Sequence, residues 1–594
     1  MPWRLKMQQN RKSDEYFFKA SDGKEIFYRY WPAANKETQE NKCFVLLHRG
    51  HEHSARLQHI ADELNLPQVP MFSFDARGHG KTQGPRGYSP SVARSVEDIE
   101  DFINHICTKY NIQKQNITII AQSISSVYAA AWVHDYAPKI RGLVLASPAF
   151  SIKLYVPFAC PAMALWQKII GRHFYISSYV NANFLTHDPQ RRKSYNEDPL
   201  VTRAIASHML LELKKLGDRI VKDARAITLP VQMFISGSDV VVHHKPQYKF
   251  YQNLGSTHKE KHIMQGFYHD TLGESNRTLI FDKIRAFIDR IYDESASADF
   301  DYKNADVWGP CADEYRKLQT PRPFFCLKGL GYKISKFAFN TLGQLSDGLK
   351  LGKKTGFNSG TMLDYIYQNK PSGKLLIGII FDKFYLDTPG WVGIRQRKIN
   401  LEKMILKAAG LLKKSKQPIR ILDVAAGHGR YILDTLKKLD GFDSALLRDF
   451  DSENVKQGQK LIKKYKLEDK VRFEKADAFD IEKTASVNPK PTIAVVSGFY
   501  EIFPENKLVE QSLKGISKAV EKGGFIIYTA QPYHPQLELI ARTLRDLHSR
   551  YKMWVMRART QAEIDFLVES QGFVKQAEVI DENGIFSVSI AQKQ

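Results

Sequence analysis

Three residues in the first half of the chain have the types and the order that acyl transfer requires. Ser123 follows a short apolar run, "NITIIAQ", and precedes a helix-like run, which predicts a tight turn between a strand and a helix. Asp239 in "FISGSDVVVHH" and His269 in "GFYHDTLGE" each follow a further strand-like run. A serine nucleophile needs a histidine base and an acid that orients the base. The order Ser, Asp, His therefore predicts a hydrolytic triad at one edge of a sheet.

The turn around Ser123 departs from the G-x-S-x-G pattern that usually surrounds such a nucleophile. Ala121 and Ser125 occupy the two glycine positions. Those glycines make room where strand and helix backbones pass close together, so the CH2OH group of Ser125 predicts crowding beside the nucleophile. Poor positioning alone can cost roughly 100-fold in rate. A working triad and a degenerate hydrolase that only binds its ligand both remain open.

An upstream loop, "VLLHRGHEHSAR", offers backbone N–H groups to an oxyanion because it contains a glycine just after a strand-like run that ends at His48. A metal site at His48, His51, His53 and His79 is the competing interpretation. The spacing of these histidines matches no HExxH motif, and no carboxylate–histidine set converges on them. We therefore expect no metal.

The second half contains "IRILDVAAGHGRYILDTL", which reads as a strand, a glycine-containing turn and a helix. Gly427 and Gly429 allow a ligand to approach the backbone closely. Asp449 ends the next strand-like run, where a carboxylate can accept the protons of both ribose hydroxyls, and Asp477 ends the third, suited to an adenine amino group. A dehydrogenase would need G-x-G-x-x-G, from which "AAGHGRY" departs. A Rossmann-like sheet with merely polar strand ends is the remaining alternative.

The elements that must position these residues follow one pattern twice, because strand-like and helix-like runs alternate in both halves. This alternation predicts two α/β domains with parallel sheets. Residues from about 150 to 229 interrupt the first series with helical, aromatic-rich sequence, as an inserted cap would. We predict a domain at 1–295, a helical connector and lead-in at 296–386, and a second domain at 387–594. The predicted strands are "CFVLLH", "MFSFDA", "NITIIAQ", "RGLVLASP", "VQMFISGSD" and "KHIMQGFYHD" in the first half, and "IRILDVA", "SALLRDFD", "VRFEKADA", "PTIAVVSG", "GFIIYTA", "KQAEVI" and "IFSVSIA" in the second.

Composition narrows the class of protein. The 594 residues include five scattered cysteines without CxxC spacing, which predicts free thiols in a reducing compartment. The N-terminal "MPWRLKMQQNRKSDEYFF" has no apolar signal region, and "LYVPFACPAMALWQ" is too short to span a membrane. We therefore expect a cytoplasmic protein.

The net charge of +23 suits either nucleic acid or an anionic membrane surface. No zinc-finger, RNP or basic-helix motif favours nucleic acid, so we expect none. The basic residues are spread along the chain, and a solvated lysine-rich surface is the competing interpretation. A peripheral contact with the inner membrane face remains open, and the sequence does not indicate the oligomeric state.

The motifs of the first half resemble the monoacylglycerol lipase and lysophospholipase branch of the α/β-hydrolases. The resemblance covers about the first 295 residues and rests on "HRGHEHSAR", "FDARGHGKTQGPRGYSPS", "AQSISS", "SGSDVVV" and "GFYHD". It implies Ser123 as nucleophile, with Asp239 and His269 as its partners. It also implies oxyanion N–H groups from Gly50 and Ile124, and a lipid-binding cap.

The glycine turn of the second half resembles motif I of class I S-adenosylmethionine-dependent methyltransferases, with Ala425 at the first glycine position. The resemblance implies a Rossmann-like fold that binds S-adenosylmethionine. Methyl transfer needs alignment and sometimes a base. The candidates for the acceptor side are Tyr500, Glu501, Tyr533 and His534, for which packing is the alternative role. The residues expected to bind the cofactor are Asp423, Gly427, Gly429, Asp449 and Asp477.

Further segments resemble a bacterial family that fuses such a hydrolase to such a methyltransferase, among them "TGFNSGTMLDYIYQNKPSGK", "GWVGIRQRK" and "SGFYEIFPENKLV". The resemblance implies a bifunctional enzyme that hydrolyses a lipid-like ester, a lysophospholipid or a monoacylglycerol, and transfers methyl groups from S-adenosylmethionine. Two alternatives stay open. In the first, the hydrolase half is only a lipid-docking module for an active methyltransferase. In the second, the methyltransferase half is only a cofactor-binding regulator of an active lipase.

Overall fold

The computed structural model describes residues 10–35, 40–156, 158–171, 174–293, 300–322, 326–545 and 553–594. The chain forms two compact units, Met1–Phe300 and Asp301–Gln594. The boundary predicted at 295/296 falls on residues 294–299, which lie outside the described residues, as do residues 1–9 of the N-terminal segment. Among the helices that the structure describes, none combines the length and the apolar character needed to cross a membrane.

The first unit is built on an eight-stranded sheet with the order β1-β2-β4-β3-β5-β6-β9-β10. The six predicted strands form its parallel part, and an antiparallel pair at one edge, β1 and β2, was not predicted. Apart from the edge strand β10, the parallel strands are buried and rich in Ile, Val, Leu and Phe, as sheets covered on both faces require. The strands are β1 (Asp14–Lys19), β2 (Glu25–Trp31), β3 (Cys43–Leu47), β4 (Met71–Phe74), β5 (Ile117–Gln122), β6 (Gly142–Ala146), β9 (Val231–Ser236) and β10 (Lys259–Met264).

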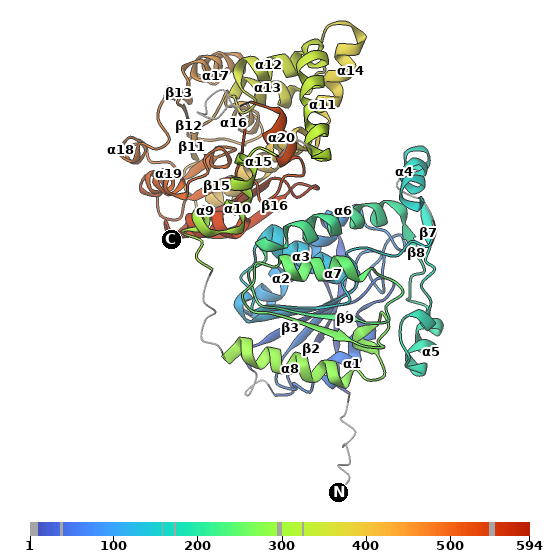
Figure 1. Cartoon of the computed structure of the whole chain (residues 1–594). Helices are drawn as coiled ribbons and strands as arrows, with labels where there is room; N and C mark the ends of the chain where they lie inside the picture. Colours follow the sequence, from blue (N-terminus) through green and yellow to red (C-terminus); the bar gives the residue numbers. More distant parts are fainter. Residues whose placement is uncertain are drawn as a thin grey trace. The chain divides into compact units, whose positions relative to one another are not determined.

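Helices cover both faces of this sheet (Figure 1). On one face, α1 (Gln58–Glu63) and α8 (Thr278–Asp293) bury apolar side chains against the strands. On the other face, α2 (Val92–Tyr110), α3 (Ile124–Tyr136), α6 (Ser207–Asp223) and α7 (His244–Asn253) pack against one another. Helix α8 is amphipathic, with Ile280, Ile284, Phe287 and Ile291 on its buried stripe.

The segment predicted as a cap lies between β6 and β9. Its outer part consists of α4 (Ala159–Ile170), α5 (Pro189–Glu197) and a small antiparallel pair, β7 (Tyr175–Ser177) and β8 (Ala204–Ala206). Its last helix, α6, packs on α3 of the main domain. The C-terminal part of the predicted cap is therefore a layer of the hydrolase core rather than a lid, because its apolar stripe is buried there.

The second unit is built on a seven-stranded sheet with the order β13-β12-β11-β14-β15-β17-β16, in which β17 runs antiparallel to its neighbours. The predicted strands form it, and the predicted fold class of two α/β domains is confirmed. The strands are β11 (Arg420–Val424), β12 (Ser444–Asp449), β13 (Val471–Lys475), β14 (Ile493–Val496), β15 (Phe525–Ala530), β16 (Phe573–Ile580) and β17 (Ser587–Lys593).

Two core clusters lie on the two faces of this sheet. One contains side chains of α15 (Pro389–Lys414), α16 (Arg430–Leu436) and α17 (Ser452–Tyr465). The other contains side chains of α19 (Asn506–Ala519) and α21 (Gln561–Glu569).

Residues 301–386, predicted as a connector and helical lead-in, are helices of the second unit. A third core cluster joins them to α15, to α20 (Leu537–Thr543) and to the residues just before β17, through side chains such as Phe357, Trp391 and Phe586. This segment therefore belongs to the fold of the second unit. Its helices are α9 (Ala305–Trp308), α10 (Pro310–Gln319), α11 (Leu327–Thr341), α12 (Asp347–Thr355), α13 (Gly360–Gln368) and α14 (Leu375–Leu386).

Two candidate active sites

Ser123 occupies the turn between β5 and α3 with a left-handed backbone, φ 58° and ψ −120°. A non-glycine residue in this region is strained by roughly 1–3 kcal/mol and persists only where its surroundings hold it. Here the Ser123 N–H donates to the Ala146 carbonyl at 2.9 Å, and the Ser123 carbonyl accepts from the N–H of Ala149 at 3.1 Å. The turn therefore has the sharp strand-to-helix geometry of a nucleophile elbow.

The structure brings the three predicted triad residues together. The Ser123 hydroxyl lies 2.8 Å from His269 Nε2, and His269 Nδ1 lies 2.7 Å from Asp239 Oδ2. Asp239 Oδ1 accepts from the N–H groups of Val241 and Val242 at 2.7 and 3.0 Å. Burial raises the pKa of Asp239, but His269 and these hydrogen bonds outweigh it and hold that pKa below its ordinary value. An ionised Asp239 fixes His269 with Nδ1 as donor and Nε2 facing Ser123.

Ser125 is accommodated by a hydrogen bond. Its hydroxyl donates to the carbonyl of His48, the residue at the end of β3 where the oxyanion loop begins. Ala121 is fully buried within β5. The contact between Ser123 and His269 therefore has hydrogen-bond length despite the crowding expected at Ser125.

A buried ionic group beside the triad was not predicted. Arg49, which precedes Gly50, makes two hydrogen bonds of 2.8 Å to Glu52. Asp270, which follows His269, accepts from Arg191 at 2.9 Å and from Gln122 at 3.1 Å. These pairs fix the loops that carry Gly50 and His269. The sequence signal was weak, because single charged residues in loops are usually solvated.

Gly50 and Ile124 both line a cavity of about 90 Å³ that reaches Ser123 and His269. A Cβ atom on Gly50 would lie 2.9 Å from Ile124 Cδ1, so only glycine fits there without a shift. Most of the other lining side chains are apolar and come from both the core and the cap, namely Ala149, Ile152, Leu154, Ile176, Val180, Leu185, Ile205, Leu210, Val241 and Val242.

Burial lowers the pKa of three loop histidines, His48, His51 and His79. Burial is the largest cause that lowers the pKa of His48, and it lowers the pKa of His51 to about 4 and that of His79 to about 3. His53 instead pairs with Asp198 at 2.9 Å. Within the described residues, no group of three or more His, Cys, Asp or Glu side chains is arranged to hold a metal ion.

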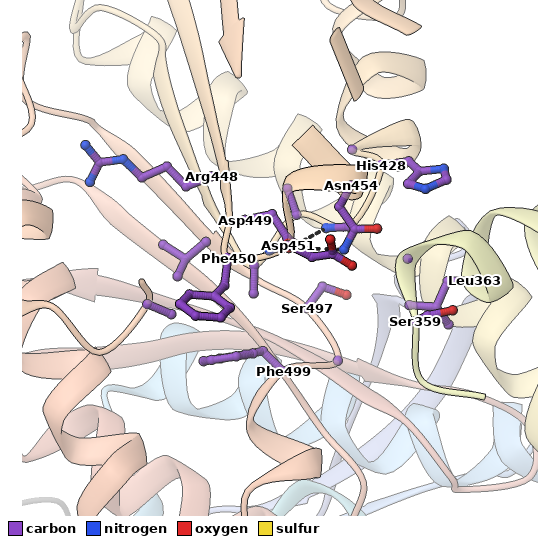
Figure 2. Close-up of a pocket in the computed structure, with 18 of the residues that line it drawn as sticks. Ser359, Leu363, His428, Arg448, Asp449, Phe450, Asp451, Asn454, Ser497 and Phe499 are labelled. Atoms are coloured by element: carbon purple, nitrogen blue, oxygen red, sulfur yellow. Dashed lines mark hydrogen bonds between the residues drawn. The ribbon is translucent and has the colours of Figure 1, made fainter. Parts of the chain in front are cut away.

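The second site is a cavity of about 930 Å³ at the carboxyl ends of β11, β12, β13 and β14 (Figure 2). The glycine turn after β11 forms one wall, with Ala425, Gly427 and Gly429 at φ 59°, 59° and 71°. The first glycine position is therefore left-handed although alanine occupies it. The Gly427 N–H donates to Asp449 Oδ2 at 2.8 Å, which ties the turn to the end of β12.

Two of the three predicted acids line this cavity. Asp449 Oδ1 accepts from the Asp451 N–H and from Asn454 at 2.9 and 3.0 Å, and burial raises the pKa of Asp449 above its ordinary value. Asp477 is exposed at the end of β13. The structure places Asp423 behind the turn, outside this lining. Asp423 is fully buried and accepts from the Tyr431 hydroxyl at 2.5 Å, and burial raises its pKa far above the ordinary value. Asp423 thus supports the turn from within the core.

The N-terminus of α13 closes the cavity opposite Asp449. Ser359 caps this helix by accepting from the Met362 N–H at 3.1 Å, and Figure 2 shows Ser359 and Leu363 across the cavity from Asp449 and Asn454. The chain passes very close here, because a Cβ atom on Gly360 would lie 2.9 Å from Gly427 Cα. The sequence signal was "NSG", a helix cap followed by glycine.

The four acceptor candidates divide into two groups. Glu501 and His534 line a second cavity of about 320 Å³, which shares Asn358, Leu363, Gly498 and Ile502 with the first. Tyr500 is a core residue whose hydroxyl donates to Ser512 at 3.1 Å. The lining of this second cavity does not include Tyr533. Tyr500 therefore has a packing role, which was the alternative stated for the aromatic candidates.

Substitutions at Ser125 test the elbow. Ser125→Ala keeps the Cβ atom and removes the hydrogen bond to His48, so we expect the free energy of unfolding of the first unit to fall by about 1 kcal/mol. Ser125→Gly should lower it by a further 0.5–1 kcal/mol or so, since glycine has more backbone freedom when unfolded. Urea unfolding measures both. A Ser125→Gly protein more stable than the wild type would mean that crowding dominates after all.

Substitution of Gly360 tests the close approach beside the glycine turn. Gly360→Ala places a methyl group against Gly427 Cα and 2.5 Å from Asn454 Oδ1, so we expect a loss of about 1–3 kcal/mol in the second unit. Gly410→Ala is the matched control, because nothing lies within 4 Å of a Cβ atom there and the helix α15 should gain stability. Equal thermal unfolding of the two variants would contradict the close approach.

Comparisons with known proteins give a family match for each half of the chain. A family model described as "Putative methyltransferase" matches residues 284–593, and one described as "Serine aminopeptidase, S33" matches residues 38–276. The chain is 50% identical over 588 residues to "Uncharacterized protein YnbC" of Escherichia coli (strain K12), an alignment that covers 99% of this chain and 100% of that protein.

The first half also has more distant relatives. It is 21% identical over 277 residues to a monoacylglycerol lipase of Mycolicibacterium smegmatis, covering 46% of this chain and 96% of that protein. A crystal structure of a soluble variant of monoglyceride lipase from Saccharomyces cerevisiae matches with a TM-score of 0.43 and 18% identity, covering 49% of this chain and 99% of that chain. The chain therefore belongs to the "Putative methyltransferase" family, and it joins a domain of that family to an α/β-hydrolase domain related to the monoglyceride lipases.

Proposed function

We propose that the first unit is a serine hydrolase that cleaves a lipid-like ester, a lysophospholipid or a monoacylglycerol. The observation that carries the proposal is the hydrogen-bonded series Ser123, His269 and Asp239 on a strained strand-to-helix turn. Distant relatives named as monoacylglycerol lipases support the choice of ester. The apolar lining of the 90 Å³ cavity supports an acyl chain beside Ser123.

In the mechanism, Ser123 Oγ attacks the ester carbonyl while His269 Nε2 takes the hydroxyl proton. Asp239 stabilises the imidazolium that forms, and the N–H groups of Gly50 and Ile124 donate to the oxyanion. His269 then returns the proton to the leaving alcohol. In the second half of the reaction, His269 activates the water that releases the acid from the acyl-enzyme.

We further propose that the second unit transfers methyl groups from S-adenosylmethionine. The cavity fits this group, because it combines backbone exposed by glycines, a buried acid at the end of β12 and an exposed acid at the end of β13. When bound, S-adenosylmethionine supplies an electrophilic methyl group. Asp449 would accept from the ribose hydroxyls and Asp477 from the adenine amino group. The turn at Gly427 and the N-terminus of α13 would exclude water from the cofactor.

Covalent linkage of the two units suggests a shared pathway in lipid metabolism. The net charge of +23 supports a cytoplasmic protein that contacts an anionic membrane surface peripherally.

Ester hydrolysis by wild type and Ser123→Ala tests the first activity. A panel of short-chain and long-chain esters, monoacylglycerols and lysophospholipids should show a loss in kcat on the order of a million-fold, as for other serine triads. Circular dichroism checks that the variant is folded. Equal rates in the two proteins, or background rates in both, would leave the hydrolase unit as a binding module and contradict the proposal.

Calorimetric titration with S-adenosylmethionine tests the second activity. Asp449→Asn removes a charged acceptor, and since such hydrogen bonds contribute about 1.5–3 kcal/mol we expect Kd to rise roughly 10- to 100-fold. Asp480→Asn is the matched control, because Asp480 caps α18 (Ile481–Ala485) through the Lys483 N–H and is not part of the cavity lining. The absence of S-adenosylmethionine binding by the wild-type protein would contradict this proposal.

A further inference from the structure

Helix α11 exposes an apolar stripe. Leu327, Leu330, Ile334 and Phe337 recur at helical spacing, and 89%, 55%, 61% and 69% of their surfaces are exposed. Such a stripe normally packs against the core of its own domain. In the described structure, no side chain of α11 is buried.

Helix α14 exposes a second apolar face, in which Leu375, Leu376, Ile377 and Phe384 are 77%, 72%, 55% and 71% exposed. Both helices pack against the short helix η6 (Leu342–Leu345), so they lie near each other in the second unit (Figure 1). We call their exposed faces together the α11/α14 surface. Monomeric proteins rarely expose a contiguous apolar patch of this kind unless it binds something.

The segment that carries the α11/α14 surface is basic. Nine lysines, no arginine and only three acidic residues lie between Leu327 and Leu386, and one of the acids, Asp382, is buried. Lys333, Lys374 and Lys383 are exposed on or beside the two helices. Apolar faces flanked by lysine are typical of helices that lie in the interface of an anionic bilayer.

The same two helices line the 320 Å³ cavity beside the cofactor site. Phe339 of α11 and Phe381, Phe384 and Tyr385 of α14 contribute to it. Trp391, Trp554 and Phe586 add further aromatic side chains, and aliphatic side chains line much of the rest. This aromatic cavity thus runs from the α11/α14 surface to residues that it shares with the cofactor cavity.

Arg397 and Glu501 are two polar residues of the aromatic cavity at its cofactor end. Arg397 is buried against Gly498, a residue that lines both cavities, because a Cβ atom there would lie 2.7 Å from an Arg397 terminal nitrogen. Arg397 Nη1 is 3.9 Å from Glu501 Oε1. Arg397 Nε, Glu501 Oε2 and Gln531 Nε2 have no hydrogen-bond partner among the described residues. Buried polar atoms are normally paired, so these three point to a ligand's polar group.

We propose that the methyl acceptor is an amphipathic membrane lipid, taken into the aromatic cavity from an anionic bilayer on which the α11/α14 surface rests. The polar head lies by Arg397, Glu501 and Gln531, and the chains extend past the aromatic side chains toward the bilayer. Methyl transfer forms a bond from the methyl carbon to a head-group oxygen or nitrogen and breaks the carbon–sulfur bond. Glu501 takes the proton that the head group loses. This inference rests on the proposed methyltransferase function.

Co-sedimentation of the full chain with phosphatidylglycerol/phosphatidylcholine vesicles tests the docking. We expect binding to the mixed vesicles and little to phosphatidylcholine alone. The double variant Ile334→Asp, Leu376→Asp should weaken vesicle binding by at least about 10-fold. Neither residue lines the aromatic cavity, and both are largely exposed, at 61% and 72%, so the fold should hold.

Two control variants test whether vesicle binding depends on the α11/α14 surface. Ile399→Asp changes a 57% exposed residue on α15 outside the α11/α14 surface and should bind vesicles like the wild type. Leu165→Asp, Ile169→Asp changes exposed residues of α4 in the hydrolase cap. Loss of binding in the α4 variant alone would overturn the proposal. Normal vesicle binding by the α11/α14 double variant would also overturn the proposal. The same holds if sedimentation without lipid shows that this double variant turns a dimer into a monomer.

Transfer of radiolabelled methyl from S-adenosylmethionine to mixed vesicles of total bacterial lipid tests the acceptor. We expect label in the organic extract for the wild type and a loss of at least about 100-fold for Glu501→Gln, with calorimetric binding of S-adenosylmethionine retained. Wild-type protein that binds the cofactor and the vesicles but labels no lipid would overturn the lipid acceptor. Absence of cofactor binding would instead contradict the proposed function itself.

Discussion

Both sites depend on a non-glycine residue held in a left-handed conformation at the end of a central parallel strand. Ser123 follows β5 with φ 58°, and Ala425 follows β11 with φ 59°. Each turn reverses the chain sharply enough to bring a helix N-terminus back over the strand end. The strain, roughly 1–3 kcal/mol per residue, is offset by hydrogen bonds to a neighbouring strand, from Ser123 N–H to Ala146 and from Ala426 N–H to Arg448, both at 2.9 Å.

Buried acids support these two turns in different ways. Asp239 is ionised because two backbone N–H groups and His269 face it, and this charge sets the tautomer of the histidine. Asp423 sits in a more apolar environment, where burial raises its pKa and the Tyr431 hydroxyl is its hydrogen-bond donor. Asp239 thus contacts the histidine of the candidate triad through its charged carboxylate, while Asp423 supports its turn as a buried hydrogen-bonding group. Asp239 was expected to be a site residue because it follows a strand, and Asp423 because the glycine turn resembles a methyltransferase motif.

The sequence was sufficient for the parallel strands, the fold class and the residues that follow the strand ends, because buried strands and their polar ends have short, local signals. Packing between residues far apart in the chain was harder to predict. The helix α6 looks like part of a cap in sequence, yet its buried stripe faces α3. Ser359 reaches the 930 Å³ cavity from a segment predicted as a connector and lead-in, and Tyr500 lies in the core. The hydrogen bond from Ser125 to His48 joins residues far apart in the chain, so no local pattern indicated it.

We propose that the strained turn presents Ser123 as an activated nucleophile although its elbow lacks both glycines. Mass spectrometry of the full chain after treatment with a fluorophosphonate measures this directly, because Ser123 Oγ would bond to phosphorus with loss of fluoride. We expect an adduct on Ser123 that forms quickly in the wild type and is strongly reduced in His269→Ala, where the base is missing. Unmodified Ser123 in a folded protein, or equal labelling without His269, would contradict it.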